Sequence, residues 1–140
     1  MTNSDSNPLT LLPEKLADEI YSNNRDGSNA EENLIYCHLY GIAGDWYISK
    51  VSKDRKNCFG FKHINTDPAW EMDQWFGNCS EWGEINIKEL QELVNTKFLK
   101  EKDIRFLITR DLFWEPKKFS DLYASHNSLY YPGEPRSYSI

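Results

Sequence analysis

Residues 45–52 read DWYISKVS, and after a charged turn residues 58–64 read CFGFKHI. Both segments are rich in aromatic and β-branched residues, which favour strands over helices. Residues 34–40 have the same character, and the glycines at Gly41 and Gly44 separate them from the second segment. Because the connections are short, the three segments predict an antiparallel meander.

The third strand of this meander contains a glycine at position 60. A glycine inside a strand weakens it, because it has no side chain to pack against its neighbours. Such a residue marks either a β-bulge or a site where another backbone approaches closely. Both interpretations of Gly60 place a local irregularity within the third strand.

One helix is predicted before the meander in the sequence and a second helix after it. Apolar residues recur at helical spacing over about residues 12–22, and a proline lies near the start of that segment, where its missing N–H is tolerated. Further along, Asn86 followed three residues later by Glu89 resembles a capping box. A second helix is therefore expected over about residues 87–96.

The remaining segments complete an α+β fold. A brief strand is expected over residues 81–85, and a final strand within residues 104–114, which Pro116 ends. A helical turn is expected near residues 119–123. We therefore predict a single antiparallel sheet of about four to five strands, a meander plus a C-terminal strand, with two main helices packed on it.

The length and composition limit the number of domains and the kinds of terminal and membrane segments that the chain can contain. Its 140 residues fit one domain. We expect a disordered lead-in over residues 1–10, a single α+β domain over residues 11–123 and a flexible tail over residues 124–140. The polar N-terminus does not have the pattern of a secretion signal, and no apolar run approaches the roughly 18 residues that span a membrane. These features predict a protein that does not enter membranes.

Charge and cysteine content indicate the compartment and the type of partner. The net charge of −6 argues against a binder that is attracted to nucleic acid by a basic stripe, and it suits a partner with a basic surface. The three cysteines are odd in number and widely spaced, which is not the pattern of a disulfide framework. A cytoplasmic protein is therefore expected.

Several groups of residues, taken in order, resemble a known family. They are LLPEKL at residues 11–16, DWYI at residues 45–48, CFGF at residues 58–61, EWGEINIKEL at residues 81–90 and RDLFWEP at residues 110–116. In this order and spacing they resemble the small bacterial proteins of the domain-of-unknown-function family numbered two-nine-five-eight. The resemblance covers roughly residues 11–123.

The resemblance implies a biological setting rather than a reaction. Members of that family are often carried on plasmids and other mobile elements, where small acidic proteins often act against host defence systems. No catalytic residues are established for the family, so none carries over to this chain. The sequence departs from the family pattern in a longer link between Phe61 and Glu81, and in Glu84, which stands where an aromatic residue is usual.

The acidic charge and the tryptophans concentrate in one region, because residues 65–92 contain seven acidic residues and one Lys. Tryptophans in a loop are typical of a protein-contact hot spot, but such rings also fold over a sheet and complete a small core. The first interpretation predicts a non-enzymatic protein-binding module, plausibly a counter-defence inhibitor of the anti-restriction or anti-CRISPR kind. Its partner-binding residues would be Trp70, Asp73, Trp75, Phe76, Glu81, Trp82 and Glu84.

Two other functions stay open as alternatives. Glu81, Glu84 and Asp111 could hold a divalent metal in an enzyme, although no spacing motif joins them. The basic region of the sequence could serve a nucleic-acid-binding accessory protein of a plasmid or phage. Its residues would be Lys97, Lys100, Lys102 and Arg105. The sequence contains none of the common nucleophile, phosphate-loop or metalloprotease motifs, so neither a catalytic residue nor a cofactor is predicted.

A zinc site would need neighbouring strands to align cysteine and histidine residues that are far apart in the chain. The candidate ligands are Cys37, His38, Cys58, His63 and Cys79. None of them has the close paired spacing of zinc ligands, and buried free thiols are the commoner use of such cysteines.

Arg110 and Asp111 are adjacent on the predicted final strand, so their side chains point to opposite faces of the sheet. Whichever of them faces the covered side must be paired there, because an unpaired buried charge is unfavourable. A structural ion pair with Glu81 or Glu115 is the expected arrangement.

Overall fold

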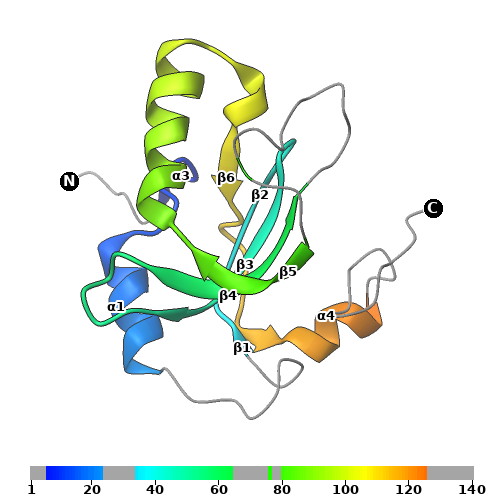
Figure 1. Ribbon diagram of the computed structural model, residues 1–140. Coiled ribbons are helices and arrows are strands. Elements are labelled where there is room, and N and C mark those ends of the chain that lie inside the picture. The colour runs from blue at the N-terminus through cyan, green and yellow to red at the C-terminus, as the bar shows by residue number, and fades with distance from the viewer. Residues whose placement is uncertain (1–5, 24–33, 65–75, 77–79, 126–140) are drawn as a thin grey trace.

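The computed structural model describes residues 6–23, 34–64, 76 and 80–125, and this part of the protein is α+β (Figure 1). Its elements are, in chain order, α1 (Glu14–Ser22), β1 (Leu34–Ile35), β2 (Cys37–Gly41), β3 (Gly44–Val51), β4 (Cys58–Ile64), β5 (Ser80–Ile85), α3 (Ile87–Leu93), a π-helix (Val94–Lys100), a 3-10 helix (Ile104–Phe106), β6 (Ile108–Arg110), β7 (Lys117–Lys118) and α4 (Phe119–Ser125). The predicted fold class is confirmed, since an antiparallel sheet of five strands forms the centre.

The five strands lie in the order β5-β4-β3-β2-β6, and β1 pairs with β7 in a separate two-stranded sheet. The meander of β2, β3 and β4 is confirmed, and β5 extends it. The final strand β6 pairs with β2 at the opposite edge. As a result β3 is the central strand, and β5 and β6 are the two edge strands.

The irregularity predicted at Gly60 is present. The register between β3 and β4 shifts between Ile48 and Lys50, so Ser49 is an extra residue opposite Gly60 and Phe59. A Cβ atom on Gly60 would collide with the carbonyl oxygen of Tyr47. The position therefore combines both predicted features, a β-bulge on one strand and a close backbone approach on the other.

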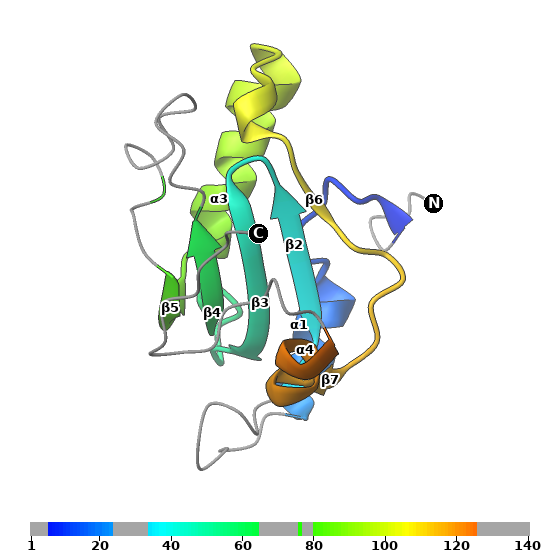
Figure 2. The same ribbon diagram turned by 90° about the vertical axis from the view of Figure 1, so that its right-hand side faces the viewer.

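The sheet has two different faces, which alternate along each strand because successive side chains point in opposite directions. On the helix-covered face, apolar residues of the strands pack with residues of α1, α3 and the π-helix. This cluster includes Ala17, Ile20, Cys37, Leu39, Trp46, Ile48, Val51, Cys58, Ile64, Ile85, Leu90 and Val94. The aromatic face carries a second cluster that contains Tyr47, Phe61, Phe119 and Leu122. In Figure 2, α4 lies in front of the sheet, and α1 and α3 lie behind it.

The second helix begins where the sequence predicts it to begin. The side chain of Asn86 accepts a hydrogen bond from the N–H of Glu89 at 3.0 Å, as its N-cap position requires. The helix is longer than the expected 87–96, because a π-helix continues it to Lys100. Thr96 contributes to this change, since its hydroxyl donates to the carbonyl of Glu92 and its own carbonyl accepts from Glu101 five residues later.

The C-terminal strand is shorter than the segment in which it was expected. Residues 104–106 form a 3-10 helix, and β6 contains residues 108–110 alone. Asp103 starts the 3-10 helix by accepting a hydrogen bond from the N–H of Arg105 at 3.1 Å. The short strand β7 was not predicted, because its two lysines become a strand by pairing with β1, more than 80 residues earlier in the chain. Within the described part of the chain, no helix is both long and apolar enough to cross a membrane.

Candidate partner-binding site

Of the residues predicted to bind a partner, Trp70, Asp73 and Trp75 lie outside the described residues. Phe76 is described, and its ring packs 5.6 Å from the ring of Trp46 and 6.0 Å from that of Phe106. Since Phe76 is half-buried against the main core, most of its ring serves packing.

Trp82 likewise packs inward, on the aromatic face. Its ring lies 5.9 Å from the ring of Phe59, 5.7 Å from that of Phe61 and 5.0 Å from that of Phe119. These contacts join β4, β5 and α4. For Trp82, as for Phe76, the structure favours the second sequence interpretation, in which the ring completes a small core.

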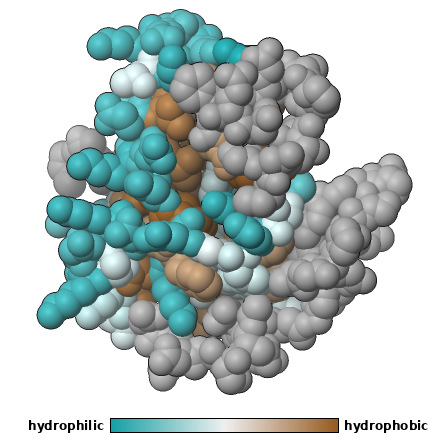
Figure 3. Space-filling view, viewed as in Figure 1, coloured by the Kyte–Doolittle hydropathy of each residue, from teal (hydrophilic) through white to brown (hydrophobic). Residues whose placement is uncertain are grey.

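The acidic residues of β5 remain at the surface. Glu81 and Glu84 are exposed, and Glu84 borders two hollows. The first, of about 140 Å³, lies between β5 and α3, where Figure 3 shows a strip of apolar surface beside the hydrophilic side of the helix. The second, of about 360 Å³, lies at the turn between β3 and β4 beside Phe59 and Lys50. This edge of the sheet therefore combines negative charge with two shallow hollows, of which the one beside Phe59 is mainly apolar.

The structure does not bring together the three carboxylates of the proposed metal enzyme. Glu81 and Glu84 lie on β5 at one edge of the five-stranded sheet, and Asp111 follows β6 at the other edge. Among the described residues, no three His, Cys, Asp or Glu side chains are grouped as metal ligands.

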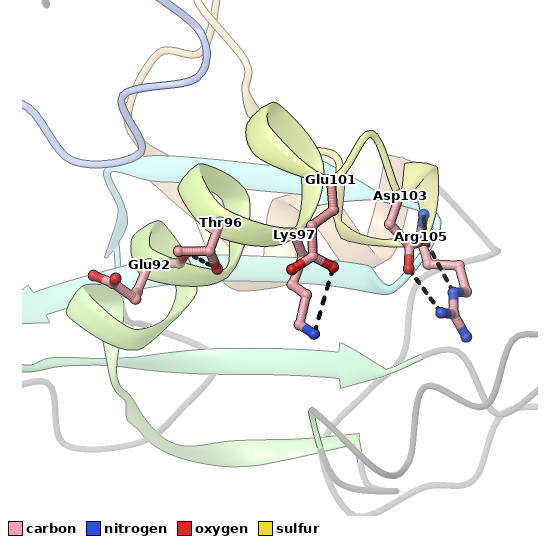
Figure 4. A network of polar contacts seen from close by, with 6 residues as sticks. All are labelled: Glu92, Thr96, Lys97, Glu101, Asp103 and Arg105. Atoms are coloured by element: carbon pink, nitrogen blue, oxygen red, sulfur yellow. Dashed lines mark hydrogen bonds and ion pairs between the residues drawn. The ribbon is translucent and has the colours of Figure 1, made fainter.

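The basic residues of the alternative nucleic-acid site lie around the end of the π-helix, and half of them are paired with acids (Figure 4). Lys97 Nζ lies 3.7 Å from Glu101, and the guanidinium of Arg105 contacts the Asp103 carboxylate at 2.7 and 3.0 Å. This contact lowers the pKa of Asp103, so the pair stays charged. Lys100 and Lys102 are exposed, and two lysines give too little charge for a stripe along nucleic acid.

The cysteines and histidines of the possible zinc site are divided between the two faces. Cys37 and Cys58 are free thiols on the helix-covered face, and burial raises the pKa of each to about 12. His38, which follows Cys37, and His63, five residues after Cys58, lie on the other face by register. The described cysteines are therefore buried, protonated core residues.

Arg110 faces the helix-covered side, but its hydrogen bonds differ from the expected ion pair. Its guanidinium donates to the carbonyl oxygen of Thr10 at 2.9 Å and to that of Asn7 at 3.2 Å. The backbone N–H of Arg110 donates to the carbonyl of Pro8 at 2.8 Å. Backbone carbonyls near the N-terminus thus receive the donors that were expected to meet Glu81 or Glu115.

The turn after β6 exposes a feature that the sequence interpretation missed. Phe113 is 92% exposed, and its neighbour Leu112 is 42% exposed. The turn is held in place from both ends. The carboxylate of Asp111 accepts the N–H of Phe113 at 3.0 Å, and the indole N–H of Trp114 donates to the carbonyl of Ile35 at 2.9 Å. The one signal in the sequence was Asp111 itself, since Asp commonly accepts the N–H two residues later in a turn.

His38 lies beneath this turn on the aromatic face. Its Nε2 is 2.9 Å from Asp45 Oδ1, and its Nδ1 is 3.9 Å from Asp111 Oδ2. Its ring stacks on Tyr47 with centroids 4.6 Å apart and an angle of 2°, and it lies 5.2 Å from the ring of Trp114. A single imidazole thus contacts the central strand and the turn that carries Phe113.

Comparison with known proteins adds no identification, since no family model, curated protein or solved structure matches this chain.

Proposed function

We propose that this protein is a non-enzymatic protein-binding module whose main hot spot is Phe113. The observation that carries the proposal is the exposure of this ring, 92%, on a turn that hydrogen bonds hold in place. These hydrogen bonds act on the backbone on both sides of the ring, so a partner that covers Phe113 has less of the turn to order. Aromatic anchors of this kind supply much of the binding energy of protein interfaces.

The surroundings of Phe113 support a partner with a basic surface. The ring is flanked along the chain by Asp111 and Glu115, and the whole chain carries a net charge of −6. At the other edge of the sheet, the exposed Glu81 and Glu84 place negative charge on opposite faces of β5, and a hollow beside Glu84 and Phe59 can receive an apolar side chain. Complementary charge accelerates association and selects among partners.

A counter-defence role is the finer part of the proposal. It rests on the resemblance to a family from mobile elements and on the acidic surface, which suits a host protein with a basic, nucleic-acid-binding groove. In that role the protein would occlude the groove of a host defence complex. The proposal does not depend on a metal or a cofactor.

The test is purification of the tagged protein from its bacterial host as wild type, as Phe113→Ala and as the control Ile104→Ala. Ile104 is 53% exposed and lies in the 3-10 helix that precedes β6, outside the turn. We expect one stoichiometric protein partner, whose dissociation constant rises by roughly 30-fold or more in Phe113→Ala, the effect of losing a hot spot of about 2 kcal/mol. The control variant should bind like the wild type.

Three outcomes would contradict the proposal. Equal binding by Phe113→Ala and wild type would show that Phe113 is not a hot spot. Co-purification of nucleic acid that salt displaces would favour the basic region instead. Stabilisation of the purified protein by Mg²⁺, Mn²⁺ or Zn²⁺ in a thermal shift would favour a metal-dependent enzyme.

A further inference from the structure

His38 is placed to couple protonation to the position of the Phe113 turn. It is largely buried, with 16% of its side chain exposed, and it lies between the carboxylates of Asp45 and Asp111. The two carboxylates come from different parts of the chain, β3 and the residues after β6. A change of charge on this imidazole is therefore felt by the central sheet and by the turn together.

A neutral imidazole can donate a hydrogen bond to Asp45, but its contact with Asp111 is then unfavourable. It has one N–H, and the distance of 2.9 Å to Asp45 assigns that hydrogen to Nε2. Nδ1 then presents a lone pair toward Asp111, and this atom is buried without a hydrogen-bond partner. A buried nitrogen lone pair that faces a carboxylate is poorly solvated and repelled.

Protonation changes this arrangement, because both ring nitrogens become donors. Nδ1–H then points to Asp111 Oδ2 across 3.9 Å, and a closure of about 1 Å forms a charge-assisted hydrogen bond. The charge also strengthens the contact with the tilted ring of Trp114.

The Phe113 turn moves together with Asp111, because hydrogen bonds tie the backbone of the turn to that residue. The second carboxylate oxygen of Asp111 accepts the N–H of Phe113, and the Asp111 N–H donates to the carbonyl of His38 at 3.0 Å. The Trp114 N–H donates to the Asp111 carbonyl at 3.3 Å. Tightening of the His38–Asp111 contact therefore restrains Phe113.

The other groups that face His38 come from each element packed on it. They are Tyr40 of β2, Asp45 and Tyr47 of β3, and Asp111 and Trp114 of the turn, with Lys117 over the Trp114 ring at 4.4 Å. His63 also interacts with Asp45, but burial lowers the pKa of His63 to about 4, so it is neutral both at pH 5.5 and at pH 8.

We propose that His38 is a proton-controlled latch for the partner-binding turn. When His38 is protonated, it draws in Asp111 and holds Phe113 in its binding position, so partner binding is tighter near pH 5.5 than near pH 8. The inference rests on the proposed function of Phe113, but the latch itself is a property of the unbound protein.

The latch is tested without a partner, by ¹³Cα relaxation of residues 111–114 at pH 5.5 and pH 8. We expect the order parameters of this turn to rise toward the value of about 0.85 for rigid backbone at pH 5.5, and to be lower at pH 8. Ile85, on the opposite edge of the sheet, should be unchanged. The matched variant is Asp111→Asn, which keeps an oxygen to accept the Phe113 N–H but removes the charge that attracts His38. Its turn should be insensitive to pH, as should that of His38→Gln.

The control His126→Gln, at the third histidine of the chain, should respond like the wild type. The latch is overturned if the wild-type turn has the same order parameters at both pH values, or if Asp111→Asn retains the full response. Asp111→Asn decides the question even if His38→Gln does not fold. A failed latch with partner binding still lost in Phe113→Ala would leave the proposed function standing. An intact latch with unchanged binding in Phe113→Ala would contradict the proposed function alone.

Discussion

The two faces of the five-stranded sheet are built from the same strands but have different chemistry. The helix-covered face is largely aliphatic, with two buried thiols, and packs on α1, α3 and the π-helix. The aromatic face combines large rings with His38, Asp45 and His63, and in the described part of the chain it is contacted by α4 and the turn before it. The comparison indicates that the first face is a scaffold, whereas the second carries the groups on which the proposed binding site and latch depend.

The central strand β3 joins the two faces, because its residues are buried on both sides. Trp46 and Ile48 belong to the first core cluster, and Tyr47 between them belongs to the second. The first cluster draws on many residues from several elements, whereas the second depends on a few large rings. Stability should therefore be more sensitive to a single substitution on the aromatic face.

The largest effect is expected for Phe61→Ala. Phe61 is 1% exposed, and its ring contacts both Trp82 and Phe119, so its removal opens a cavity and loosens α4. We expect a loss of about 3–5 kcal/mol in the free energy of unfolding. Urea denaturation followed by tryptophan fluorescence measures it.

The matched variant on the helix-covered face is Leu39→Ala, which is also fully buried. It should lose about 2–5 kcal/mol and leave the α4 contacts intact. Limited proteolysis after residue 118 distinguishes the two variants, because cleavage should accelerate in Phe61→Ala alone. Equal cleavage in both would mean that the two faces are not independent.

A somewhat smaller loss in the free energy of unfolding is expected for Gly60→Ala. It should be about 3 kcal/mol, which is the upper end of the usual cost of an overpacked core. The new Cβ would meet the Tyr47 carbonyl and push β4 away from β3, which disturbs both faces together. Gly83, its register partner on β5, has no atom within 4 Å of an added Cβ. Gly83→Ala should therefore change thermal stability little, and a loss there as large as in Gly60→Ala would exclude the steric explanation.

The smallest effects are two shifts of stability with pH, one for each face. Burial raises the pKa of Cys37 and Cys58 from 9.0 to about 12, so the unfolded chain ionises first as pH rises. Their contribution is complete below pH 9 and is lost between pH 9 and 12. Burial lowers the pKa of His63 from 6.5 to about 4, so its contribution is complete above pH 6.5 and is lost as pH falls toward 4.

These shifts are measured as the midpoint of urea unfolding between pH 4 and 11. Cys58→Val should reduce the loss on the alkaline side without abolishing it, because Cys37 remains, and should leave the acid side unchanged. His63→Gln should flatten the acid side and leave the alkaline side unchanged. A Cys58→Val profile that follows the wild type above pH 9 would show that the thiol is not the group responsible.

Much of the scaffold was predictable, because it depends on local patterns. The strands around Trp46 and Phe61, the N-cap at Asn86 and the irregularity at Gly60 all follow from residues near one another in the chain. The candidate site was less predictable. Trp82 has the same local signature as a contact residue, but the strand register turns its ring toward Phe61 and Phe119.

The sequence by itself determined the fold class, the alternation that builds two faces and the start of the second helix, because each needs only the spacing of neighbouring residues. The tertiary structure decided where Phe113 and His38 lie. Trp114 holds the turn by donating to Ile35, 79 residues earlier in the chain, and His38 meets Asp111 because β6 pairs with β2. Pairing between distant segments has no local signal, since its energy exists only once the chain has folded.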